Sequence, residues 1–128
     1  MSISNLLIDN KYQIYGRIFQ MNEVANAVTT SITGAQVADG IATIATAGGA
    51  VSCQLPTAAA LVAAFPGIIV GNVVKCLFAA NGATNAATLT TNTGLTLLAA
   101  PSIPAQTSRI VYFRFTNVTL TTEAVSVY

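Results

Sequence analysis

The sequence predicts an all-β fold, a jelly-roll-like β-sandwich with one short helix. One observation behind this prediction is that apolar and polar side chains alternate in several short segments, as they do in half-buried strands. Another is the recurrence of Gly, Asn and Pro, the residues of tight turns, at intervals of about ten residues. The length of 128 residues fits one domain around a single core.

The first 33 residues carry two competing patterns, and both predict association. Apolar residues at every second position favour a strand over 5–19 (Leu6, Ile8, Tyr12, Ile14 and Ile18). A second apolar set has the alternating spacings of four and three residues that a short coiled coil shows (Ile14, Ile18, Met21, Ala25, Val28 and Ile32). Residues 20–32 fit either a strand or a helix. We therefore expect an N-terminal strand or oligomerisation segment over 1–33 and a β-sandwich domain over 34–128.

The stretch that follows is rich in Ala, Thr, Gly and Asn and shows no repeat of fixed period. Strands are predicted around 41–46 and 50–55. The pair Gly48-Gly49 lies between them and supplies the positive φ that a tight turn needs. We therefore expect these two strands to form a hairpin.

One helix is predicted in the middle of the chain. Thr57 is a suitable N-cap, the Ala-rich residues after it have high helix propensity, and Pro66-Gly67 ends the segment, so the helix covers about 57–64. The residues "VVKCLFAANG" then indicate a strand that ends at the turn residues Asn81-Gly82. Two further short strands are expected on either side of the turn at 92–94.

The last third of the chain has the clearest strand pattern. Alternation in "SRIVYFRFTN" assigns one set of side chains to the core (Val111, Phe113 and Phe115) and the other set to the opposite face (Ile110, Tyr112 and Arg114). A polar turn region follows, and the final strand "EAVSVY" turns Val125 and Val127 inward. Tyr128 then falls on the outer face, which water would cover in a monomeric sandwich.

The composition favours association over a solitary molecule. Hydrophobic residues make up 53% of the chain and charged residues 7%, against about 25% charged residues in typical soluble domains. Because lone soluble proteins seldom expose large apolar patches, we expect copies of the chain to cover one another. The net charge of +1 comes without a cluster of Lys and Arg, so we expect neither a nucleic-acid nor a membrane partner. Pro66-Gly67 also interrupts the best candidate for a membrane span.

Catalysis, metal binding and cofactor binding are not expected. Histidine is absent, which removes the commonest general base and metal ligand. Lys75 is the one plausible lysine of a Ser-Lys site, but alternation places it on the exposed face of a strand beside the inward Cys76. The four acidic residues are scattered along the chain (Asp9, Glu23, Asp39 and Glu123). Cys53 and Cys76 lie in apolar runs and are interpreted as two buried, reduced thiols.

The tyrosines leave two kinds of recognition open. Exposed tyrosine rings stack on the apolar faces of sugars, and the same rings are suited to subunit interfaces. The candidates are Tyr12, Tyr15, Tyr112 and Tyr128. The residues expected at a contact between subunits are Ile14, Ile18, Met21, Tyr112 and Tyr128.

Residues from about 50 to 128 resemble a known group of modules. The stretches "LPTAAALVAAFPGIIVGNVVKCLFAANG" and "LTLLAAPSIPAQTSRIVYFRFTNVTLTTEAVSVY" are similar to small β-structured modules in virion proteins of tailed bacteriophages and large DNA viruses. The opening "NLLIDNKYQIYGRIFQ" looks like the N-terminal strands of surface or fibre proteins of giant viruses. The collagen-like Gly-x-y tract that often precedes such modules is absent from this sequence.

The resemblance implies a non-enzymatic structural virion protein. Such a protein would be a capsid decoration, fibre or surface component, assembled as a homotrimer in the host cytoplasm and in contact with other virion proteins. No catalytic, cofactor-binding or metal-binding residue is implied, because the shared pattern serves folding and packing. A glycan-binding or host-attachment module is the alternative function.

Overall fold

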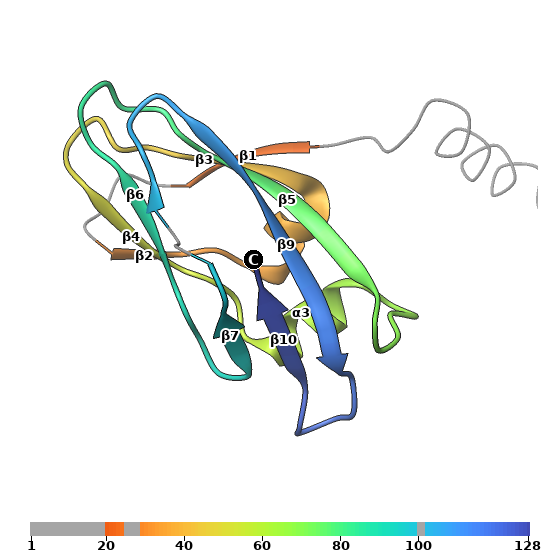
Figure 1. Cartoon of the computed structure of the whole chain (residues 1–128). Helices are drawn as coiled ribbons and strands as arrows, with labels where there is room; N and C mark the ends of the chain where they lie inside the picture. Colours follow the sequence, from red (N-terminus) through yellow and green to blue (C-terminus); the bar gives the residue numbers. More distant parts are fainter. Residues whose placement is uncertain (1–19, 25–28, 100–101) are drawn as a thin grey trace, which may run out of the picture.

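The strands of this protein form two sheets around one core (Figure 1). The structure is a computed structural model and describes residues 20–24, 29–99 and 102–128. Sheet A has six strands in the order β1 (Gln20–Val24), β3 (Gly40–Ile44), β5 (Val73–Ala80), β9 (Ser108–Asn117), β10 (Ala124–Val127) and β7 (Leu95–Leu97). Sheet B has four, in the order β2 (Thr29–Ser31), β4 (Val51–Gln54), β6 (Ala87–Thr90) and β8 (Ser102–Ile103). This arrangement confirms the predicted β-rich, two-sheet fold.

The chain builds the two sheets by circling between them. The strands β1, β3 and β5 lie side by side in sheet A, and β2, β4 and β6 lie side by side in sheet B. We call each passage through one strand of sheet A and the next strand of sheet B a coil. Neighbouring coils pair in parallel in both sheets, and five of the eight strand pairs of the described chain are parallel.

The jelly-roll-like order that the sequence predicts is not what these ladders show, because a jelly roll consists of antiparallel strands. The difference has a local cause. Two short helices carry the chain from sheet B back to the same end of sheet A, so that the next strand starts in the same direction as the last. The coils have unequal lengths, since Gln20 pairs with Gly40 but Ile41 pairs with Leu77. A repeat of fixed period is therefore absent from the sequence although the coil recurs in the structure.

The first helix, α2 (Gly34–Asp39), corrects the prediction of a single helix. A capping box starts it: the Thr33 hydroxyl accepts a hydrogen bond from the Gln36 N–H at 3.2 Å, and Gln36 Oε1 accepts one from the Thr33 N–H at 2.9 Å. Gly40, with a φ of 94°, ends it in the left-handed region. With six residues, the helix is too short to show an apolar periodicity in the sequence.

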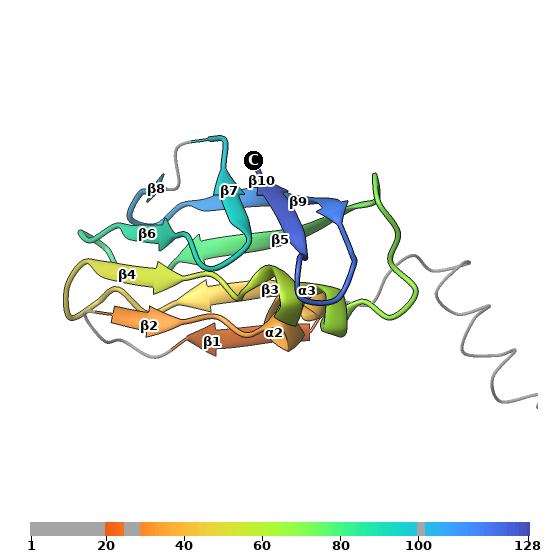
Figure 2. The same cartoon turned by 90° about the horizontal axis from the view of Figure 1, so that it is seen from below.

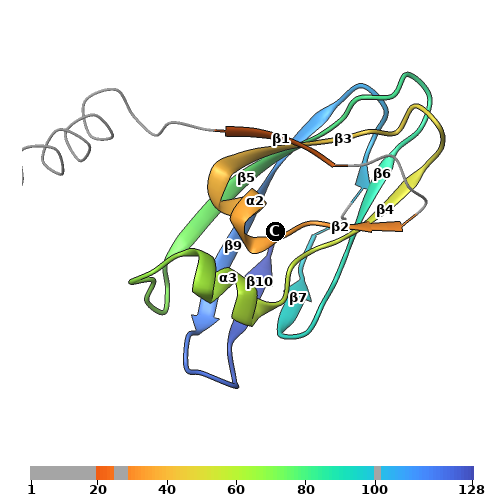
Figure 3. The ribbon, with the colours of Figure 1, turned by 180° about the vertical axis from the view of Figure 1, so that it is seen from behind.

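The second helix, α3 (Ala58–Ala64), lies where the sequence predicts a helix. The Thr57 hydroxyl accepts a hydrogen bond from the Ala60 N–H at 3.1 Å, as an N-cap does. The two helices lie next to each other at the end where the chain returns to sheet A (Figure 3). Within the described part of the chain, neither helix has the length and apolar character needed to cross a membrane.

A glycine makes the contact between the helices close. A Cβ atom on Gly34 would lie 2.6 Å from the carbonyl oxygen of Ala60, which is a backbone atom and cannot turn away. Only a residue without a side chain fits at this point. The packing of α2 on α3 therefore depends on Gly34.

The turn that contains Gly48-Gly49 is not a hairpin turn, which corrects the prediction. The strands before and after it, β3 and β4, belong to different sheets and do not pair. The turn instead stacks on the corresponding turn of the next coil. The buried Thr46 hydroxyl accepts a hydrogen bond from the Gly82 N–H at 2.8 Å, and the Thr46 carbonyl accepts one from Asn85 Nδ2 at 3.0 Å. The turn at 92–94 likewise connects strands of different sheets, β6 and β7.

The core lies between the sheets and confirms the predicted faces of the C-terminal strands. Val111, Phe113, Phe115, Val125 and Val127 are all buried. Cys53 and Cys76 are buried among them and are not joined by a disulfide, as the apolar runs around each predict. Phe115 also meets Phe65 edge to face, with 6.0 Å between the ring centroids.

The described parts of the N-terminal segment are strands of the two sheets. Residues 20–24 and 29–31 are strands, which settles that part of the segment left open between strand and helix. Gln20–Val24 pairs with β3 and Thr29–Ser31 pairs with β4. The expected boundary between 33 and 34 falls between β2 and α2. The strand predicted over 5–19 lies outside the described residues.

Candidate interaction surface

One face of sheet A points away from the core and carries large apolar side chains. Alternation along β3, β5, β9 and β10 separates its residues from the buried ones. We define the outer face of sheet A by the residues Ile41, Val73, Lys75, Leu77, Ile110, Tyr112, Arg114 and Tyr128. Four of them are among the most exposed large apolar or aromatic residues of the described chain (Val73, Ile110, Tyr112 and Tyr128). The outer face of a two-sheet monomer is ordinarily polar, and this face departs from that rule.

The centre of the outer face is a pair of tyrosines. Tyr112 donates its backbone N–H to the Tyr128 carbonyl at 3.0 Å, and Tyr128 donates its own to the Tyr112 carbonyl at 2.9 Å. Residues that exchange two such bonds stand directly opposite each other, with side chains on the same face. Tyr112 is 43% exposed and Tyr128 is 41% exposed. The two rings therefore form one neighbouring, partly exposed aromatic surface.

A groove lies next to this pair. Its volume is about 180 Å³, and Gly40, Ile41, Lys75, Leu77 and Ile110 line it. Because β3, β5 and β9 are neighbours in the sheet, residues from three separate parts of the chain meet here. Apart from the lysine, the lining is apolar, which suits an apolar side chain from another molecule.

The charges on the outer face are all positive. Lys75 is registered opposite Tyr112, and Arg114 lies opposite Val73 on one side and Ser126 on the other. No acidic residue occurs in the strands β3, β5, β9 and β10. Lys75 is exposed and alternates with the buried Cys76, as predicted. Its neighbours in the groove offer no base or second nucleophile.

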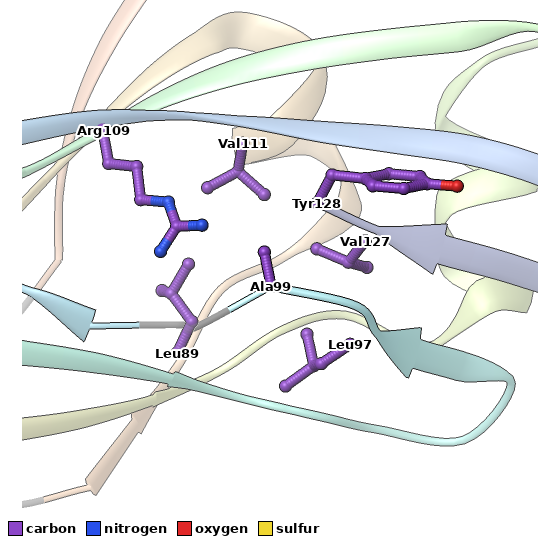
Figure 4. Close-up of a pocket in the computed structure, with 7 residues that line it drawn as sticks. All are labelled: Leu89, Leu97, Ala99, Arg109, Val111, Val127 and Tyr128. Atoms are coloured by element: carbon purple, nitrogen blue, oxygen red, sulfur yellow. The ribbon is translucent and has the colours of Figure 1, made fainter.

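A second, smaller hollow lies between the sheets. It has a volume of about 10 Å³, which is room for about one water molecule. Leu89, Leu97, Ala99, Arg109, Val111, Val127 and Tyr128 line it (Figure 4). Figure 4 shows that the Arg109 side chain runs toward Leu89, whereas the Tyr128 ring points away from the hollow.

Potential metal ligands are dispersed among the described residues. Within 20–24, 29–99 and 102–128, no three His, Cys, Asp or Glu side chains gather around a common point. Burial raises the pKa of the Cys53 thiol to about 11, because the apolar surroundings disfavour the charged thiolate. Cys53 is therefore a neutral core residue at physiological pH and a poor nucleophile.

The structure brings together two of the five residues that the sequence places at a subunit contact. Tyr112 and Tyr128 form the pair described above. Met21 lies in β1, where its backbone is registered with Ile41 of the groove. Ile14 and Ile18 lie outside the described residues.

Sequence reasoning missed the contribution of the other strands to this face. Ile41, Val73 and Leu77 belong to it but come from strands that the chain visits earlier. A signal was present in "VVKCLF", because Val73 and Leu77 have the same alternation as Lys75. The near-continuous apolar run hid that alternation, since the neighbours on the inner face are apolar too.

No protein-family model, no curated protein and no solved structure matches this chain.

Proposed function

We propose that this chain is a non-enzymatic structural protein of a virus particle and that it assembles as a homotrimer in which sister chains cover the outer face of sheet A. The place in a particle, as a capsid decoration, fibre or surface component, is supported by the resemblance of residues 50–128 to virion modules. The trimeric state is supported by the same resemblance. The assembly itself is supported by the exposed apolar surface of the sheet.

The observation that carries the proposal is the row of exposed apolar and aromatic side chains on β5 and β9. Val73, Ile110 and Tyr112 are each more than two-fifths exposed, although they lie in the middle of a sheet and not on a loop. Burying such side chains between subunits stabilises an assembly by about 25 cal/mol for each Å² removed from water. A chain with so few charges gains little from ion pairs, so the burial of apolar surface is the main source of stability of the assembly.

The charges on the outer face favour a ring over a two-fold dimer. If two copies met through this same face, Lys75 and Arg114 of one copy would approach those of the other, and no acidic residue of β3, β5, β9 or β10 would compensate them. The outer face therefore packs on a different surface of the next copy. A contact of this head-to-tail kind closes into a ring when the rotation fits, and a trimer is one such ring.

Light scattering on variants tests the assembly. The wild-type chain of 13.1 kDa is expected to show a trimer mass. Ile110→Glu places a charge on the outer face and is expected to lower that mass. Leu120→Glu is the matched control, because Leu120 lies in the β9–β10 loop and is 79% exposed. A monomeric wild type at micromolar concentration would overturn the proposal. Mass spectrometry of purified virus particles from the source of this sequence tests the place in a particle.

A glycan-binding or host-attachment module is the second candidate, and the tyrosine pair favours it. Two neighbouring rings on a flat sheet are suited to stacking on the apolar face of a sugar ring. A panel of host-surface glycans, screened with the wild type, Tyr112→Ala and Tyr128→Ala, separates the two candidates. Sugar binding that the changes abolish while the oligomer stays intact supports recognition of glycans. The loss of the oligomer without any glycan bound supports the subunit contact.

A further inference from the structure

The turns that join the two sheets stack on one another at the end of the molecule opposite the helices, and one of them carries a chemically labile pair (Figure 2). The turn from β3 to β4 contains Thr46, and the turn from β5 to β6 contains Asn81-Gly82. Asparagine loses its side-chain amide readily, and a glycine after it speeds the loss because no side chain hinders the approach. Asn81 is the one asparagine of the sequence that glycine follows.

Both residues of the pair contribute to the stacking of the turns. Gly82 lies so close to Thr46 that a Cβ atom on it would lie 2.5 Å from the Thr46 carbonyl carbon, so a side chain does not fit there. Asn81 Oδ1 accepts a hydrogen bond from the Thr46 N–H at 3.3 Å. The packing that stacks the turns therefore also builds the labile pair into the fold.

The loss of the amide is a reaction within the chain. The Gly82 nitrogen attacks Cγ of Asn81, a C–N bond forms between them, and the bond from Cγ to the side-chain nitrogen breaks. That nitrogen takes up the proton of the Gly82 N–H and leaves as ammonia, and a cyclic imide remains. Water then opens the ring at one carbonyl to give aspartate or at the other to give isoaspartate. The only co-reactant is water.

In the folded chain the attacking nitrogen is engaged elsewhere. The Gly82 N–H donates to the buried Thr46 hydroxyl at 2.8 Å, and Gly82 is itself buried. The Gly82 carbonyl accepts a hydrogen bond from the Gln106 N–H at 3.2 Å, so the residue is held on both sides. For the attack, Gly82 would have to give up the bond to Thr46, and the Asn81 carboxamide would have to leave the Thr46 N–H.

We infer that Asn81-Gly82 is a deamidation site that the Thr46 hydroxyl keeps closed, and that it reacts only when the stacked turns open. Segments of a folded protein open locally at a lower free energy than global unfolding requires. The rate of the reaction then follows the population of the open turn. This inference goes beyond the proposed function and holds for a monomer as for an oligomer.

The isoaspartate product makes the opening irreversible. It places one more carbon atom in the backbone between position 81 and Gly82, so Gly82 cannot keep its hydrogen bonds to both Thr46 and Gln106. Each of these bonds joins the turn to another part of the chain. A molecule that has reacted in this way is therefore expected not to close again.

Timed incubation of the full chain, followed by mass spectrometry, tests this inference. The protein is kept at neutral pH, in buffer or in urea, and then digested with trypsin at slightly acidic pH, which limits further reaction. Residues 76–109 contain no internal lysine or arginine and leave as one peptide, so Asn85 and Asn92 are internal references for Asn81. Electron-transfer fragmentation distinguishes aspartate from isoaspartate. We expect Asn81 to react first in urea and to stay intact in the folded protein.

Variants of Thr46 test the part played by the hydroxyl. Thr46→Val removes the acceptor of the Gly82 N–H and should speed the loss of the Asn81 amide in buffer about tenfold, because the open turn becomes more populated. Thr46→Ser keeps the hydroxyl and should show only a small part of this effect. Equal rates in the two variants would overturn the inference.

Gly34→Ala separates local opening from global unfolding, because it disturbs the contact of the helices at the other end of the molecule. If it speeds the reaction of Asn81 as much as Thr46→Val does, the reaction proceeds through global unfolding and the inference is wrong. Hydrogen exchange of the Gly82 N–H in the wild type decides the question without a variant. Urea below the unfolding transition should raise the exchange rate and the deamidation rate together, and a constant deamidation rate would contradict the inference.

The two products test the irreversibility. Asn81→Asp stands for the aspartate product, which keeps a side-chain oxygen for the Thr46 N–H and should fold as the wild type does. Chains with isoaspartate at position 81, separated by chromatography after incubation in urea, should fail to refold. Refolding of both products to the same stability would show that the opening is reversible.

Discussion

Tyr112 and Tyr128 stand directly opposite each other in sheet A and exchange two backbone hydrogen bonds, at 3.0 and 2.9 Å. The bonds belong to the backbone, so the pairing of the strands does not depend on the rings. The rings lie on the outer face, where each is about two-fifths exposed. The two residues can therefore be changed to test recognition without changing the fold.

Tyr112→Ser and Tyr128→Ser should each raise the dissociation constant of the oligomer about tenfold, because aromatic residues at the centre of an interface carry much of its binding free energy. Sedimentation equilibrium measures the constant, and circular dichroism checks the fold. Leu120→Ser, in an exposed loop outside the outer face, is the control. Unchanged association in both tyrosine variants would show that the contact lies elsewhere.

Thr46→Val should destabilise the protein by about 1–3 kcal/mol, because the N–H of Gly82 would lose the acceptor that it has in the buried Thr46 hydroxyl. Valine has nearly the same shape, so the effect measures the hydrogen bond and not a cavity. Urea denaturation gives the free energy of unfolding. Thr88→Val, at an exposed position of β6, should change it by about 0.5 kcal/mol or less. Equal effects at both positions would contradict the importance of the stacked turns.

Gly34→Ala should destabilise the protein by about 1–2 kcal/mol, although alanine is the better helix former. The added methyl group would lie 2.6 Å from the carbonyl oxygen of Ala60, so α2 and α3 would have to move apart. Thermal unfolding measures the effect, with Ala35→Ser at the neighbouring exposed position as control. A gain in stability would show that the helices are free to separate.

Stability should fall in alkaline solution because of Cys53. Its pKa is about 11 in the folded protein, against an ordinary value of 9.0 in the unfolded chain. The unfolded state therefore loses the proton first, so the contribution is complete below pH 9 and is lost as the pH rises toward 11. The loss amounts to about 2–3 kcal/mol for a shift of this size.

Urea denaturation between pH 8 and 11 tests the Cys53 prediction by comparing the wild type with Cys53→Ala. The two proteins differ only at this residue, so the difference between their slopes of unfolding free energy against pH isolates the thiol. If the free energy of unfolding fell equally steeply with pH in both proteins, the thiol would not be desolvated.

Local patterns in the sequence predicted those parts of the fold that depend on neighbouring residues. The alternation of Val111, Phe113 and Phe115 with Ile110, Tyr112 and Arg114 fixed both faces of β9, and Thr57 marked the start of α3. The prediction of a hairpin at Gly48-Gly49, made from the same kind of local pattern, was wrong. A turn sequence says that the chain reverses, but not whether the strands beyond it pair with each other or with the coils before and after.

The candidate surface was predictable only along single strands. Tyr112 and Tyr128 were placed on the outer side because alternation along β9, and along β10 to the residue that follows it, puts them there. Ile41 and Leu77 join them through ladders that link residues more than thirty positions apart, such as Leu77 with Ile110. Pairing at that distance depends on the whole topology, and the parallel coils were not visible in a sequence without a fixed period.

The central claim is that sister chains cover the outer face of sheet A, and hydroxyl-radical footprinting of the wild type tests it most directly. Oxidation of Ile110, Tyr112 and Tyr128 is compared with oxidation of Leu120 across a dilution series. We expect the three outer-face residues to be protected at high concentration and to become reactive on dilution, while Leu120 stays reactive throughout. Equal reactivity of the outer-face residues at every concentration would contradict the claim.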